Sequence, residues 1–147
     1  MSIVPNPAGF LMRDTWRADA VLAHRFELRG GPDAPAQARA NLARLVAGRL
    51  GEIDLFDVTV LLSEVVTNAV HHGKTGVDET VIVHVALAPG VLRVEVCDQG
   101  PGFTRPDVIG ARPEGGGNGL VLLERMSTCW GVAGDDGTCV WFERVLP

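Results

Sequence analysis

The amino-acid sequence predicts an α+β fold, a two-layer sandwich with helices on one face of a β-sheet. Three observations predict it. Two amphipathic helical stretches follow each other between residues 34 and 72, two strands rich in β-branched residues come next, and a shorter helix with a closing strand pair ends the chain. A chain of 147 residues suffices for one compact domain, which buries roughly 70% of its unfolded surface at this size.

Local signals set the bounds of each element. Residues 1–22 contain Pro5, Pro7 and Gly9 and show no periodicity, so we expect a flexible N-terminal arm before a domain spanning residues 23–147. Asp33 is a suitable N-cap for the first helix, and Gly51 is a suitable stop. We expect helices at 34–50, 54–72 and 120–127, and strands at 24–28, 79–87, 92–98, 129–132 and 138–145.

Composition excludes several classes of protein. Hydrophobic residues make up 46% and charged residues 21% of the chain, which argues against wholesale disorder. The net charge of −5 argues against a non-specific nucleic-acid binder, which would carry a basic surplus. No stretch approaches the roughly 18 apolar residues of a membrane helix, and the N-terminus has no signal-peptide pattern. We therefore expect a cytoplasmic protein with no direct nucleic-acid or membrane partner.

The three cysteines predict neither a disulfide framework nor a zinc site. Cys97, Cys129 and Cys139 are scattered, form no CxxC motif and have no histidine at ligand spacing. All three lie in apolar, strand-like runs, so we expect buried free thiols in a reducing compartment.

The second predicted helix carries a polar stripe beside its apolar face. Glu64, Asn68 and the pair His71 and His72 recur at three- and four-residue spacings and so share one side of the helix. A carboxylate can activate a hydroxyl group, and a carboxamide one turn later can hold Mg²⁺ through an uncharged oxygen. The alternative interpretation is an ordinary solvated helix face.

Two glycine motifs follow the polar stripe. Asp98-Gln99-Gly100-Pro101-Gly102 stands at the end of a predicted strand, where the carboxylate can accept a hydrogen bond from an exocyclic amine and the glycines allow close approach to a flat ring. Gly115-Gly116-Gly117-Asn118-Gly119 opens the helix at Leu120, so that backbone N–H groups and the helix N-terminus can cradle a phosphate. An ordinary turn and a flexible linker are the respective alternatives. Neither motif is a Walker A loop or a Rossmann fingerprint.

In this order, the three motifs resemble the N, G1 and G2 boxes of the GHKL ATPases, which share the Bergerat fold with histidine kinases and gyrase. The matching segments are SEVVTNAVHHG (63–73), VEVCDQGPGF (94–103) and GGGNGLVLLERM (115–126). Within this group, the chain is similar to the anti-sigma-factor serine/threonine kinases of bacteria and their actinobacterial ATP-binding relatives. The resemblance extends over residues 24–145 and implies a mixed, mainly antiparallel sheet.

The resemblance implies a role for each motif residue. Glu64 corresponds to the general base toward the acceptor hydroxyl, Asn68 to the Mg²⁺ ligand, and Asp98 to the residue that reads the adenine amino group. Residues 104–114 correspond to the ATP lid. The other residues implied to bind ATP are Gly100, Gly102, Arg112, Gly115, Gly116, Gly117, Asn118, Gly119 and Leu120.

Three features depart from the family pattern. Asn118 stands where related sequences often have Arg or a hydrophobic residue, and Thr138-Cys139 replaces a frequent Lys-Thr. The lid offers only Arg105 and Arg112 as cations, which leaves negative charge on the γ-phosphate weakly covered.

The function implied by the resemblance is a cytoplasmic, homodimeric, Mg·ATP-dependent serine/threonine kinase. It would phosphorylate an anti-anti-sigma (STAS-type) protein, sequester a sigma factor, or both. The alternative is an ATP-responsive protein-binding module with the same fold and weak catalysis. A histidine kinase is disfavoured, because the chain has no room for a separate dimerisation helix with a phospho-accepting histidine.

Overall fold

Five strands and three helices make up the part of the chain that the computed structural model describes, which comprises residues 17–72, 79–98, 118–133 and 138–147. The elements, in chain order, are β1 (Leu22–Arg29), α1 (Ala34–Leu45), α2 (Glu52–His72), β2 (Thr80–Ala88), β3 (Val91–Asp98), α3 (Asn118–Met126), β4 (Cys129–Ala133) and β5 (Thr138–Val145).

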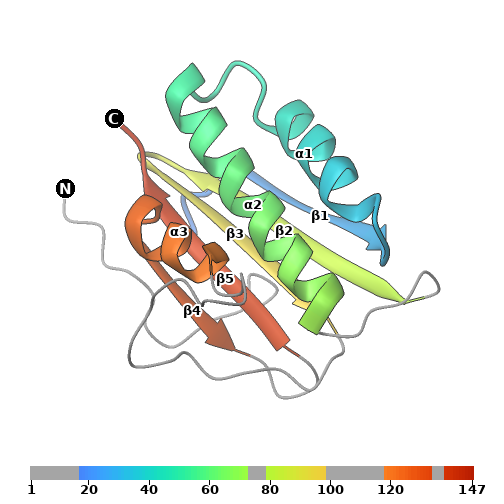
Figure 1. Cartoon of the computed structure of the whole chain (residues 1–147). Helices are drawn as coiled ribbons and strands as arrows, with labels where there is room; N and C mark the ends of the chain where they lie inside the picture. Colours follow the sequence, from blue (N-terminus) through green and yellow to red (C-terminus); the bar gives the residue numbers. More distant parts are fainter. Residues whose placement is uncertain (1–16, 73–78, 99–117, 134–137) are drawn as a thin grey trace.

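The strands form one sheet in the order β1-β2-β3-β5-β4, and every described pair is antiparallel. The chain therefore leaves β3, forms α3 and β4, and returns so that β5 lies between β3 and β4. All three helices lie on one face of this sheet (Figure 1). The predicted α+β sandwich is confirmed, with antiparallel pairing throughout the described strands.

Each predicted element is present, and only the end of α1 differs from its expected bound by more than two residues. α1 ends at Leu45 instead of residue 50, with Val46 as its C-cap, and Gly48 follows in a left-handed conformation with φ 74°. Gly51 is therefore not the stop of this helix. Asp33 does occupy the N-cap position, but its side chain makes no capping hydrogen bond.

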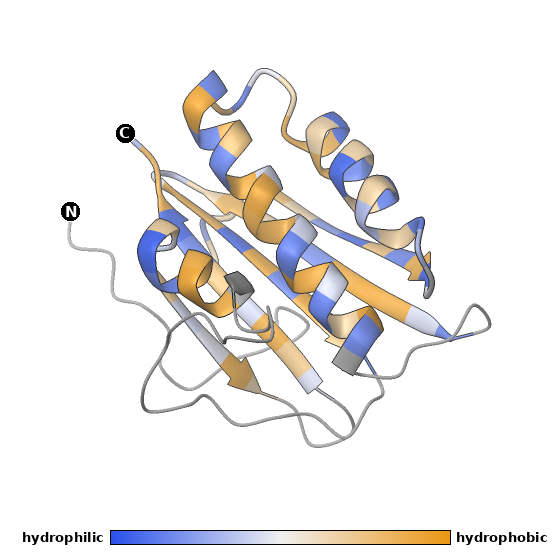
Figure 2. Cartoon of the chain, viewed as in Figure 1, coloured by the Kyte–Doolittle hydropathy of each residue, from blue (hydrophilic) through white to orange (hydrophobic). Residues whose placement is uncertain are grey.

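The hydrophobic core fills the space between the helices and the sheet. Alternate residues of the central strands, such as Val83, Val85 and Val94, are fully buried and face the helices. Figure 2 shows apolar positions along α2 and along these strands. α2 is the longest described helix with 21 residues, yet none of the described helices combines the length and apolar character needed to cross a bilayer.

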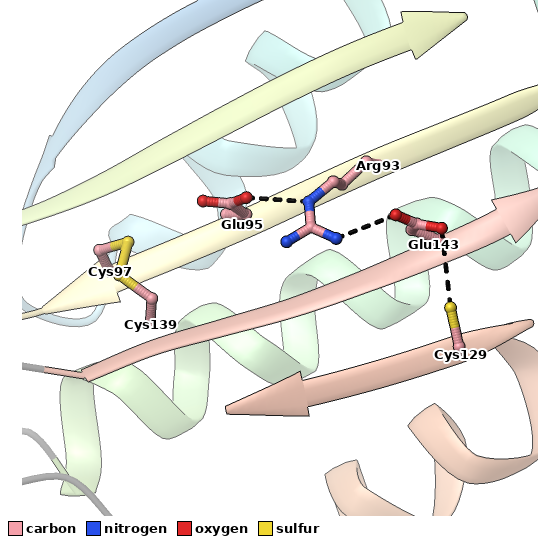
Figure 3. A network of polar contacts seen from close by, with 6 residues as sticks. All are labelled: Arg93, Glu95, Cys97, Cys129, Cys139 and Glu143. Atoms are coloured by element: carbon pink, nitrogen blue, oxygen red, sulfur yellow. Dashed lines mark hydrogen bonds and ion pairs between the residues drawn. A yellow bond between two sulfur atoms is a disulfide. The ribbon is translucent and has the colours of Figure 1, made fainter. Parts of the chain in front are cut away.

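The opposite face of the sheet carries charged side chains that are buried as deeply as the core (Figure 3). Arg93 of β3 donates from Nε to Oε2 of Glu95 at 2.8 Å and from Nη1 to Oε1 of Glu143 at 2.9 Å. Its guanidinium carbon lies 4.3 Å from the ring centre of Trp141. Both Arg93 and Glu95 are 0% exposed. We call Arg93, Glu95, Trp141 and Glu143 the Arg93 network.

The prediction of three free thiols is wrong for two of them. Cys97 and Cys139 oppose each other in the β3–β5 register, with their Cα atoms 4.0 Å apart, and form a disulfide. The pairing of β3 with β5 places the two cysteines opposite each other. The spacing of residues along the sequence does not reveal the pairing register of distant strands, so this disulfide was not predicted. Cys129 is free as expected, and burial, reinforced by the charge of Glu143, raises its pKa to about 12.

Candidate functional site

Glu64 and Asn68 lie one turn apart on the C-terminal half of α2. Both residues are partly exposed, whereas Val65, Val66 and Ala69 beside them are buried. The polar stripe thus borders the apolar face of the helix and does not interrupt it. A carboxylate and a carboxamide are presented at the edge of the core, where a ligand can reach them.

One side-chain hydrogen bond ties this part of α2 to α1, and another lies within α2. Arg39 of α1 donates from Nη1 to Oγ of Ser63 at 2.8 Å, and Oγ1 of Thr67 donates to the carbonyl oxygen of Ser63 at 2.7 Å. The backbone that carries Glu64 is therefore braced at the adjacent residue. His71 is exposed near the end of the helix, and the side chain of His72 lies outside the described residues.

Asp98 is the last residue of β3 and is partly exposed. It pairs across the sheet with Thr138, the first residue of β5, which is 6% exposed. The neighbouring strand therefore fixes the backbone of Asp98 at the point where the chain leaves the sheet. A carboxylate so placed is a suitable acceptor for a hydrogen bond from a ligand amine.

Three elements bring the described residues of the predicted motifs into one region. α2 packs against both β3 and α3. Figure 1 shows α2 and β3 ending at the same end of the sheet, with α3 beginning beside α2. α3 begins at Asn118, two residues before the expected start at Leu120. The first turn of a helix has backbone N–H groups without intrahelical partners, which favours an anion at that position.

The other predicted ATP contacts are only partly described. Asn118 and Gly119 belong to α3 by their backbone, and Leu120 is partly buried against the core. The side chain of Asn118 lies outside the description, as do the lid at 104–114 and all the remaining predicted glycines. The predicted residues outside the described ranges are Gly100, Gly102, Arg112, Gly115, Gly116 and Gly117.

The donor set suits Mg²⁺ that is shared with a nucleotide. Within the described ranges, no group of three or more His, Cys, Asp or Glu side chains could form a metal cage. Mg²⁺ commonly keeps several water ligands and uses one or two protein oxygens together with phosphate oxygens. The partly exposed amide oxygen of Asn68 is compatible with this arrangement.

A surface groove lies away from these residues. It runs between β1, at the edge of the sheet, and α1. Strand β2 separates this edge from β3 and hence from Asp98. The residues that line the groove are His24, Arg25, Phe26, Asn41, Arg44 and Leu45.

The sequence interpretation missed the disulfide next to Asp98. Cys97 precedes Asp98, and Cys139 follows Thr138, so the two half-cystines lie one residue inside the last pair of the β3–β5 ladder. The strand-like runs around both cysteines were visible in the sequence. An assumed β3–β5 pairing that joined the ends of these runs would have placed the cysteines opposite each other.

Comparison with known proteins bears on the whole fold. The profile of the histidine kinase-like ATPase domain family matches residues 30–144. A crystal structure of the RsbU and RsbW domains of Rv1364c from Mycobacterium tuberculosis has a similar fold, with a TM-score of 0.65, 24% sequence identity and coverage of 86% of this chain. The match covers 33% of that chain, so this protein spans about a third of its length. No curated protein sequence matches significantly. Since the family profile spans all three motifs and nearly every element of the fold, the chain belongs to the histidine kinase-like ATPase domain family.

Proposed function

We propose that this protein is an ATP-binding serine/threonine kinase of the anti-sigma type. The observation that supports it best is the placement of Glu64 and Asn68 on one partly exposed stripe of α2, with Asp98 at the same end of the sheet. The match to the histidine kinase-like ATPase family makes ATP the expected ligand of this region.

In this proposal each residue has one task. Asp98 accepts a hydrogen bond from the adenine amino group, and the backbone N–H groups at the start of α3 receive phosphate oxygens. Glu64 removes the proton of the attacking hydroxyl as the γ-phosphoryl group is transferred. Asn68 would contribute an oxygen to Mg²⁺, which supplies charge neutralisation at the phosphates. The catalysis consists mainly of positioning and charge stabilisation.

The lid and the glycine motifs complete the proposed site. Gly100 and Gly102 would line the adenine pocket, and residues 115–119 would surround the phosphates. Arg112 would supply a cation from the lid. We propose residues 23–147 as the ATPase domain and residues 1–22 as a preceding arm.

The proposed partners are proteins of a sigma-factor pathway. The RsbW domain named in the similar structure is consistent with such a setting, although at 24% identity the likeness concerns the fold. We propose that a STAS-type anti-anti-sigma protein is the phosphate acceptor and that a sigma factor is the competing partner. A homodimer in the cytoplasm is the proposed state of the protein.

Nucleotide binding is the first test. Calorimetric titration of the full chain with a non-hydrolysable ATP analogue should show saturable, Mg²⁺-dependent binding. Asp98→Asn should abolish or strongly weaken it, because the carboxamide would present a competing donor toward the adenine amine. Asp33→Asn is the matched control. The side chain of Asp33 makes no capping hydrogen bond, so replacing its carboxylate should not alter nucleotide binding. Wild-type protein that binds no analogue at millimolar concentration would refute the kinase proposal.

Phosphoryl transfer is the second test and separates the kinase from the binding-module alternative. With γ-labelled ATP and purified STAS-domain proteins, Glu64→Gln should lose about 10²–10⁴-fold in transfer rate while its affinity for ATP is kept. Glu52→Gln is the matched control, since Glu52 is an exposed carboxylate at the opposite end of α2. If neither the wild type nor Glu64→Gln transfers phosphate, and both bind the partner equally well, the result would favour the ATP-responsive binding module.

A further inference from the structure

The Cys97–Cys139 disulfide closes a loop that contains the proposed phosphate-binding region. The sequence separation of 42 residues encloses Asp98, the glycine motifs, α3 and β4. Of the residues proposed to contact ATP, only Asn68 and Glu64 lie outside this loop. One covalent bond therefore joins the two ends of the segment that carries all the other residues proposed to contact ATP.

The bond sits immediately beside Asp98. Cys97 and Cys139 are opposed in the register, and the next pair, Asp98 and Thr138, is the last of the β3–β5 ladder. The ends of strands open more readily than their centres. A crosslink one residue from the end holds Asp98 to β5 when the terminal pair would otherwise fray.

The two half-cystines differ in their exposure to solvent. Cys97 is partly exposed, whereas Cys139 is 7% exposed. The adjacent part of the same sheet face is closed by the Arg93 network, with Glu95 two residues before Cys97 (Figure 3). An attacking thiolate therefore reaches the disulfide most easily at Sγ of Cys97.

The third cysteine does not compete in this chemistry. Cys129 lies in β4, and its Sγ is 3.7 Å from Oε2 of Glu143 at the other end of the Arg93 network. Burial and the Glu143 carboxylate raise its pKa to about 12, which keeps it a neutral thiol. Within the described chain, Cys97 and Cys139 form a self-contained redox pair.

We propose that the Cys97–Cys139 bond is a reversible redox switch that controls nucleotide affinity by fixing Asp98 at the end of β3. This inference rests on the proposed ATP site. The reductant is a dithiol. Its thiolate attacks Sγ of Cys97, the S–S electron pair leaves on Sγ of Cys139, and that thiolate takes up a proton. The second thiol of the reductant then displaces Cys97, which leaves two protein thiols and one cyclic disulfide of the reductant. Oxidation by a small-molecule disulfide reverses the exchange.

The test compares the oxidised and the dithiothreitol-reduced full chain. We expect the reduced protein to bind the ATP analogue about 5- to 30-fold more weakly, the range for fixing the backbone of one residue on binding. The double variant Cys97→Ser and Cys139→Ser should behave as the reduced form under both conditions. Cys129→Ser should respond to reduction as the wild type does.

Amide hydrogen exchange without nucleotide gives a readout independent of the ATP site. Reduction should increase exchange at residues 96–98 and 138–140 more than at the centre of β2. Equal nucleotide affinity in both redox states would overturn the switch alone. So would Cys97 and Cys139 remaining free thiols after the reduced protein is treated with a small-molecule disulfide. Absence of nucleotide binding in both states would overturn the proposed function and the switch with it.

Discussion

Arg93 is the single cation of the Arg93 network, and it contacts the two buried carboxylates Glu95 and Glu143. In Arg93→Met both carboxylates lose this partner while the methionine keeps much of the side-chain volume. Breaking a buried ion pair by removing one member costs about 3–5 kcal/mol. This is a large part of the roughly 5–15 kcal/mol that stabilises a small domain. We therefore expect a strongly lowered urea midpoint for this variant.

A matched control exists on the same sheet. Arg25 of β1 forms an ion pair with Glu27, which lies two residues further along the strand, just as Glu95 lies two residues after Arg93. The side chain of Arg25, however, is 51% exposed. Arg25→Met should therefore cost at most about 1 kcal/mol. Urea unfolding of both variants measures the difference. Equal destabilisation of the two would refute the reasoning.

Three further predictions concern the remaining features of the sheet. In Gly131→Ala the new Cβ would lie 2.8–2.9 Å from the indole of Trp141, so we expect the free energy of unfolding to fall by about 1–3 kcal/mol, measured by thermal unfolding. Gly51→Ala, whose new Cβ would have no atom within 4 Å, should leave the stability nearly unchanged. Iodoacetamide should modify Cys129 on the order of 1,000-fold more slowly at pH 8 than an ordinary thiol, and the rate should rise with pH; an ordinary rate in the folded protein would contradict its burial. Reduction of the disulfide should lower stability by up to about 4 kcal/mol, from the chain entropy of a 42-residue loop, and an unchanged urea midpoint would contradict this.

The sequence alone was sufficient for most of the secondary structure. Helix periodicity predicted α2, and runs of β-branched residues predicted β2, β3 and β5 nearly to their ends. The end of α1 was the exception, because Gly48 rather than Gly51 adopts the left-handed conformation beyond the helix. Both glycines were compatible with a helix stop by local rules.

The candidate site was predictable to the extent that it depends on local order. Glu64 and Asn68 share a stripe because four residues make about one helical turn, and Asp98 ends its strand where the first glycine motif begins. The convergence of α2, β3 and α3 required the three-dimensional fold. Helical and strand periods fix which side a residue faces, but not which other element comes to lie beside it.

Tertiary structure alone decided the character of the second sheet face. The alternation of Arg93 and Glu95 with valines predicts a face directed away from the core, yet both side chains are fully buried. The disulfide depends in the same way on the pairing of β3 with β5, since Cys97 and Cys139 are distant in sequence. The physical reason is common to both. Burial and cross-strand register are set by contacts between distant segments, and the sequence determines them only through the folded chain.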